Sequence, residues 1–139
     1  MNWRTFVSHC LVAIGAALLF AGCASFDDVK QARGEGIKRT FKRPYDDVFA
    51  AAINAAHQKK LTIVNSVRDS GTILLSNAAS LGSPGGERIA MFITRLNART
   101  TSVEVVARPV VPTVSFPPDW PGLLFGEIEE NLAAQRLSQ

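Results

Sequence analysis

The spacing of apolar residues predicts one clear helix, from Tyr45 to Lys59. Apolar side chains recur there every three or four positions, as they do along one face of an amphipathic helix. Two aspartates lie in the first turn and lysines close the segment, which is the charge order that the helix dipole favours. The apolar positions are Tyr45, Val48, Phe49, Ala52, Ile53 and Ala56. We expect this face to cover a sheet.

Five further segments have the composition and alternation of β-strands. Turn residues at Arg68–Gly71 separate the second from the third, and Asn97–Thr100 separates the fourth from the fifth, so we expect two hairpins. From Ser102 to Arg108, apolar side chains alternate with polar ones, which indicates a sheet with one solvated face. The predicted strands are Ile37–Lys42, Leu61–Val67, Thr72–Asn77, Arg88–Leu96 and Thr101–Val110.

A last helix is predicted to begin at Trp120 or Pro121, with Asp119 as its N-cap. Its apolar stripe consists of Leu124, Ile128, Leu132 and, more loosely, Phe125 and Leu137. The order of elements is then β-α-β-β-β-β-α. The predicted fold is α+β: a two-layer sandwich, with two helices on one face of a four- to five-stranded antiparallel sheet.

The segment from Pro109 to Trp120 has four prolines among apolar residues, so it cannot be a central strand. Two interpretations stay open. In the first, Val114, Phe116 and Trp120 lie over the domain and close its core. In the second, Phe116 and Trp120 form an exposed apolar rim that contacts a partner or a lipid.

The amino terminus has the three parts of a secretion signal. Arg4 is its only charged residue, Leu11–Phe20 is an apolar run, and Ala21 and Gly22 are small residues before Cys23. The uninterrupted apolar and small stretch is about 15 residues, short of the roughly 20 that cross a bilayer as a helix. An ordinary cleaved signal and an uncleaved anchor are the alternatives.

The run Ala21-Gly22-Cys23 resembles the lipobox of bacterial lipoprotein precursors. The sequence departs from that pattern at Phe20, where the family usually has leucine. The resemblance implies that Cys23 becomes the first mature residue and carries a diacylglyceryl group and an acyl chain. Two or more such chains hold a protein stably on a membrane. Ala24 after the cysteine implies the outer membrane, with the domain in the periplasm; the inner membrane is the alternative.

This interpretation divides the chain into a signal peptide (1–22), a lipidated flexible tether (23–36) and one α+β domain (37–139). Without Arg4, the formal net charge is +2, from 14 basic and 12 acidic residues, which is no sign of nucleic-acid binding. Basic residues gather between Lys30 and Arg43. They form either a solvated surface or an arm that contacts anionic phosphate groups of lipid or lipopolysaccharide.

The sequence offers little for catalysis. If Cys10 is removed and Cys23 is lipidated, the mature domain has no cysteine, and His57 is its single histidine. We expect His57 to be a partly exposed structural residue. The glycine-rich segment Leu81–Gly86 lacks the Gly-Lys-Ser/Thr ending of a phosphate-binding loop. We therefore predict no catalytic, cofactor-binding or metal-binding residue.

The domain resembles the helix-grip domains of the Bam-complex lipoprotein BamC and small bacterial lipoproteins of similar layout. Besides the lipobox, the matching residues are the helix Tyr45–Ala52, the strand Leu61–Val64 and the run Ser70–Ile73. The resemblance implies a role in envelope assembly or interaction. The preferred hypothesis is a lipid-anchored interaction module that docks on an envelope protein. The alternatives are a binder of a lipid or other apolar ligand between helices and sheet, and a hydrolase that depends on His57.

Overall fold

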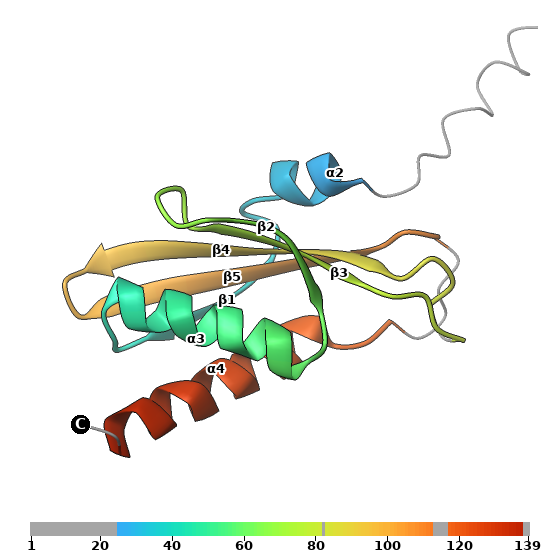
Figure 1. Cartoon of the computed structure of the whole chain (residues 1–139). Helices are drawn as coiled ribbons and strands as arrows, with labels where there is room; N and C mark the ends of the chain where they lie inside the picture. Colours follow the sequence, from blue (N-terminus) through green and yellow to red (C-terminus); the bar gives the residue numbers. More distant parts are fainter. Residues whose placement is uncertain (1–24, 82, 113–116, 138–139) are drawn as a thin grey trace, which may run out of the picture.

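The protein is built around a five-stranded antiparallel sheet (Figure 1). The computed structural model describes residues 25–81, 83–112 and 117–137. The strands lie in the order β1-β5-β4-β3-β2, so β1 and β2 form the two edges. In chain order the strands are β1 (Ile37–Phe41), β2 (Thr62–Val67), β3 (Thr72–Asn77), β4 (Glu87–Asn97) and β5 (Thr100–Pro109). The predicted α+β class and both hairpins are confirmed.

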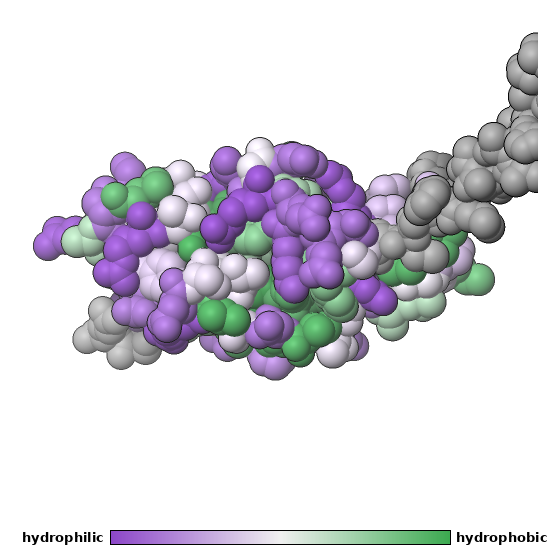
Figure 2. Space-filling model, turned by 90° about the horizontal axis from the view of Figure 1, so that it is seen from above, coloured by the Kyte–Doolittle hydropathy of each residue, from purple (hydrophilic) through white to green (hydrophobic). Residues whose placement is uncertain are grey.

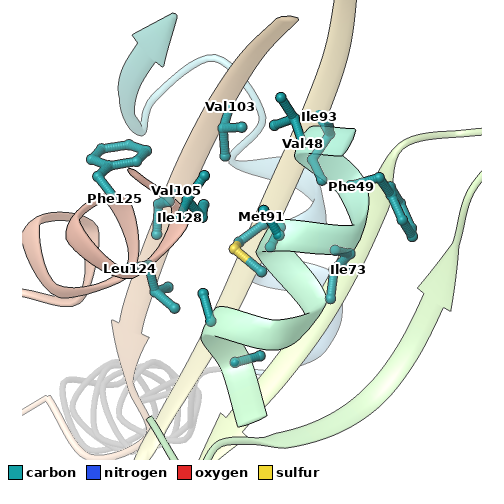
Figure 3. Close-up of a cluster of buried hydrophobic side chains, with 14 of the residues drawn as sticks. Val48, Phe49, Ile73, Met91, Ile93, Val103, Val105, Leu124, Phe125 and Ile128 are labelled. Carbon is teal, nitrogen blue, oxygen red and sulfur yellow. The ribbon is translucent and has the colours of Figure 1, made fainter. Parts of the chain in front are cut away.

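Two helices, α3 (Tyr45–Gln58) and α4 (Trp120–Leu137), cover one face of the sheet and contact each other (Figure 1). Because side chains alternate along a strand, Ile89, Met91 and Ile93 of β4 all point toward these helices. They form a buried core with residues of α3, α4, β3 and β5, part of which Figure 3 shows. Truncating a large side chain in such a core to alanine typically costs about 2–5 kcal/mol.

The two helices follow their predicted apolar faces closely. Small residues let α3 approach its neighbours, since four of its alanines are fully buried: Ala51, Ala52, Ala55 and Ala56. On α4, the stripe Leu124, Ile128 and Leu132 is buried, and Asp119 Oδ1 accepts a hydrogen bond from the Gly122 amide (3.1 Å), as an N-cap does. Leu137, which we assigned loosely to the stripe, is exposed because α4 ends there.

A third helix, α2 (Phe26–Gln31), lies on the opposite face of the sheet (Figure 1). It is held by a second buried cluster, in which Val29 of α2 is fully buried. The other members of that cluster are Ala32, Leu74, Ala90, Phe92 and Val106, with Phe26 at its margin. The face that we expected to be solvated is therefore partly covered.

The start of α2 is closed by a capping box. Ser25 Oγ accepts a hydrogen bond from the Asp28 amide (3.2 Å), and the Asp28 carboxylate accepts one from the Ser25 amide. Hydrogen bonding of the Asp28 carboxylate to the Ser25 amide, and to a lesser extent to the Ser25 hydroxyl, holds the pKa of Asp28 below its ordinary value.

The helix α2 corrects the expectation of a flexible tether over residues 23–36. From Ser25 onward the described chain is folded against the sheet, because a short helix places Phe26, Val29 and the following Ala32 on one side. The connection to β1 is also fixed, since the amides of Gly34 and Gly36 donate to Glu104 Oε1 (2.6 and 2.8 Å). The folded part of the described chain thus includes Ser25 and the residues that follow it.

Candidate functional site

The residues predicted to carry function fall in different places. Cys23 and Phe116 lie outside the described residues. Trp120 is only 6% exposed and belongs to the main core, in line with the interpretation in which it closes the core. It therefore offers little surface to a partner, and we no longer assign a contact to it. His57 is exposed in the last turn of α3.

The basic segment Lys30–Arg43 is largely neutralised by neighbouring carboxylates. Four of its six cations are in ion pairs: Lys30–Asp27 (3.2 Å), Lys38–Glu104 (3.8 Å), Arg39–Glu129 (2.9 Å) and Arg43–Asp47 (3.1 Å). Of these, Lys30–Asp27 and Arg39–Glu129 are exposed on both sides, and such pairs contribute only about 0–1 kcal/mol of stability. This segment thus resembles an ion-paired surface more than an arm free to bind anions, and its two cations without an ion pair among the described residues are Arg33 and Lys42.

Arg33 lines a hollow of about 530 Å³, which we call the arginine pocket. The pocket lies where the turn between β2 and β3, the start of α3 and the carboxy-terminal half of β4 meet. Three arginines from segments far apart in the sequence line it. Its charged and aromatic lining is Arg33, Tyr45, Asp46, Arg68, Asp69 and Arg95.

Gly71 fixes the backbone beside the arginine pocket. Its φ of 67° is in the left-handed region, and a Cβ at this position would lie 2.0 Å from the carbonyl oxygen of Ile93. Any other residue would push the turn away from β4, where the Ile93 amide donates to the Gly71 carbonyl (2.7 Å). This close approach brings Arg68 of the turn toward Arg95 of β4.

Tyr45 connects the helix to the turn. Its phenol donates a hydrogen bond to the carbonyl of Arg68, and the Arg95 guanidinium lies over its ring at 5.1 Å. Partial burial raises the pKa of the Tyr45 phenol above its ordinary value, although the nearby Arg68 opposes the rise. Tyr45 therefore acts as a neutral donor and as a platform for a cation.

The three arginines differ in their partners. Arg68 pairs with Asp46 (2.6 Å), and both side chains are more than half exposed. Arg33 donates to the Ser70 carbonyl (3.3 Å) and lies over the Phe92 ring at 4.6 Å. Within the described ranges, neither Arg33 nor Arg95 has an ion pair with a carboxylate. The pocket thus holds two arginines that form no ion pair, although the Asp69 carboxylate also lines it.

An adjoining hollow of about 360 Å³ lies on the face that carries α2 and shares Arg33 and Ser70 with the arginine pocket. Its lining includes the apolar side chains of Val67, Leu74 and Phe92. Figure 2 views this side and shows wide hydrophilic areas interrupted by smaller hydrophobic ones. The two hollows together place a cationic pocket beside an apolar one.

A separate hollow of about 360 Å³ lies at the carboxy-terminal end of β5, near the start of α4. It is lined by Glu87, which is 1% exposed, and by Trp120. Glu87 Oε2 accepts from Asn77 Nδ2 (2.7 Å), while Glu87 Oε1 and Trp120 Nε1 have no hydrogen-bond partner among the described residues. Both unpaired atoms are shielded from solvent, so neither is open to a ligand in this structure.

The arginine pocket can bind a negatively charged group, and the sequence analysis did not predict it. The only hint of the pocket in the sequence was Arg68 in the turn of the first hairpin. That Arg33 and Arg95 line the same pocket depends on contacts between segments far apart in the sequence. No group of three or more potential metal ligands was found in the part of the chain that the structure describes. In the same part, no helix has the length and apolar character of a membrane span.

Comparison with known proteins identifies no family for this chain: no protein-family model and no curated protein matches it.

Proposed function

We propose that the protein is a lipid-anchored interaction module of the bacterial cell envelope, which acts by binding and not by catalysis. Cys23 carries the anchor, and Ala24 favours the periplasmic side of the outer membrane. The observation that carries the proposal is the run of apolar and small residues that ends at Cys23. Its resemblance to a lipobox supplies an attachment chemistry that no other residue of the chain offers.

The position of α2 adds a geometric consequence to this proposal. Only Ala24 separates Cys23 from Ser25, the cap of α2. Each residue spans at most about 3.6 Å, so the two steps reach roughly 7 Å. A lipidated Cys23 therefore holds α2, and the sheet face that α2 partly covers, close to the bilayer surface.

Attachment is tested by fractionation of cells that express single-cysteine variants. We expect Cys23→Ser to move the protein out of the membrane fraction, because the sulfur that receives the diacylglyceryl group is gone. Cys10→Ser is the matched control, since it makes the same change within the leader, and it should stay with the membranes. Equal membrane retention of both variants would refute anchoring through Cys23.

The edge strand β2 supports the binding part of the proposal. It pairs with β3 alone, so its outer edge leaves backbone hydrogen-bonding groups open to an added strand. Two of its apolar side chains are unusually exposed, Val64 at 49% and Val67 at 43%. We propose this edge as the surface that contacts an envelope protein.

A photoreactive residue at Val64 or Val67 tests the contact in intact cells. The expected result is a crosslinked adduct with another envelope protein. Leu123, which is 42% exposed on α4, is the control position and should give little adduct. Recovery of only uncrosslinked protein from the β2 positions, or equal adducts from Leu123, would refute this surface.

The alternative of a lipid held between helices and sheet has less support. Core side chains of α3, α4 and the sheet occupy that interval, as Figure 3 shows for ten labelled residues.

A further inference from the structure

We infer that the arginine pocket binds a phosphate group. This inference names a ligand for the binding function proposed above. It is nevertheless tested separately, because membrane attachment is measured by cell fractionation and phosphate binding by the rate at which individual arginines are chemically modified. The sequence analysis did not predict this pocket. Of its three arginines, only Arg33 belongs to the basic segment Lys30–Arg43 discussed above.

The first support is the state of the charges. Arg33 and Arg95 have no carboxylate partner among the residues that the structure describes, while Asp46 is paired with Arg68. A bound dianion would be attracted by all three guanidinium groups. Asp69, on the pocket wall, opposes binding and sets a limit on the affinity.

The second support is the origin of the three cations. Arg33 follows α2, Arg68 lies in the turn after β2, and Arg95 lies on β4, so the three arginines that line the pocket come from different segments. A phosphate group presents oxygen atoms in several directions and accepts hydrogen bonds from several arginines at once. A carboxylate is planar and offers only two oxygens, so it matches this arrangement less well.

The third support is that the pocket is held in place before any ligand arrives. All three arginines lie over aromatic rings, Arg33 over Phe92, Arg68 over Phe49 and Arg95 over Tyr45. The turn that carries Arg68 is fixed by the Tyr45 hydrogen bond and by the close approach at Gly71. Such preorganisation lowers the entropy lost when a ligand binds.

The source of the phosphate is either a lipid headgroup or a free phosphorylated molecule. The adjoining apolar hollow, which shares Arg33, offers room for an apolar group linked to the phosphate. If Cys23 is lipidated, this side of the molecule is also close to the bilayer. Both sources share the same chemistry at the arginines, and the experiment distinguishes them.

The test measures how fast phenylglyoxal modifies individual arginines of the acylated full-length protein in detergent, read by peptide mass spectrometry. Inorganic phosphate should slow modification of Arg33 and Arg95 several-fold. Arg136, an exposed arginine on α4, is the internal control and should react at an unchanged rate. Chloride at equal ionic strength and succinate should protect neither pocket arginine. Equal protection by chloride or succinate would overturn the inference. Absence of protection by inorganic phosphate would overturn it as well, unless the lipid experiment below shows protection.

The lipid arm uses the same protein in nanodiscs of phosphatidylglycerol or of phosphatidylcholine, with no phosphate in the buffer. Protection of Arg33 and Arg95 in the phosphatidylglycerol discs alone assigns the headgroup as the source. Protection by inorganic phosphate alone assigns a free phosphorylated ligand. Protection in neither arm refutes the inference.

Charge variants give an independent readout. Arg33→Ala and Arg95→Ala should each weaken the affinity for inorganic phosphate about tenfold, since each removes a charged hydrogen-bond donor. Arg136→Ala removes the same charge elsewhere and should change nothing. Asp69→Asn should strengthen binding, because it removes the opposing charge. Weaker binding by Asp69→Asn, or equal losses in all three arginine variants, would contradict a specific pocket.

Discussion

At the scale of single residues, Tyr45 joins three features of the arginine pocket. Its phenol holds the turn through the Arg68 carbonyl, its ring carries Arg95, and its partial burial favours the neutral phenol. One side chain therefore couples the stability of the hairpin to the position of two cations. This coupling can be measured by removing only the hydroxyl group.

We predict that Tyr45→Phe lowers the free energy of unfolding by about 1 kcal/mol at neutral pH, because one hydrogen bond is lost. The raised pKa gives the pH dependence its sign. Folding favours the neutral phenol, so this stabilisation is complete below the ordinary value of 10.0 and is lost as the pH rises through the pKa of the folded state. Denaturant unfolding of both proteins from pH 7 to 11 measures it. A difference between wild type and variant that grows with pH would contradict this account.

At the scale of elements, α2 is the part of the fold that most depends on a few contacts. It has six residues, too few for a helix that is stable on its own. Packing of Val29 against the second face of the sheet therefore decides whether α2 forms.

We predict that Val29→Ala loosens α2 and lowers the free energy of unfolding by about 1–3 kcal/mol, since it removes two buried methyl groups. Hydrogen exchange at the amides of residues 28–32 should become faster than in the wild type. Gln31→Ala, on the exposed side of the same helix, is the matched control and should leave exchange unchanged. If Val29→Ala exchanges like the control, α2 does not depend on this packing.

The elements also differ in how far the sequence predicts them. The strands and the two long helices were predicted within one or two residues, because alternation, helical spacing and turn residues are local properties. The helix α2 was missed, since a charged six-residue segment with Phe26 and Val29 has no periodic run to detect. The arginine pocket was missed for another reason. Arg33, Arg68 and Arg95 line one pocket only through the packing of α2, strand pairing and the close approach at Gly71, none of which is local.

At the scale of the whole molecule, the proposed anchor and the observed fold constrain each other. A domain on a long flexible tether could reach partners far from the membrane. A domain whose helix α2 begins three residues after a lipidated cysteine could not, and its α2 side would stay at the bilayer surface. The β2 edge and the arginine pocket would then act close to the membrane.

The most direct test of the central claim is the mass of the amino-terminal peptide of the protein purified from its own membranes. The account predicts that the mature chain begins at Cys23 and that this residue carries a diacylglyceryl group and an amide-linked acyl chain. A peptide that begins upstream of Cys23, or one that begins at Cys23 without added lipid mass, would contradict it.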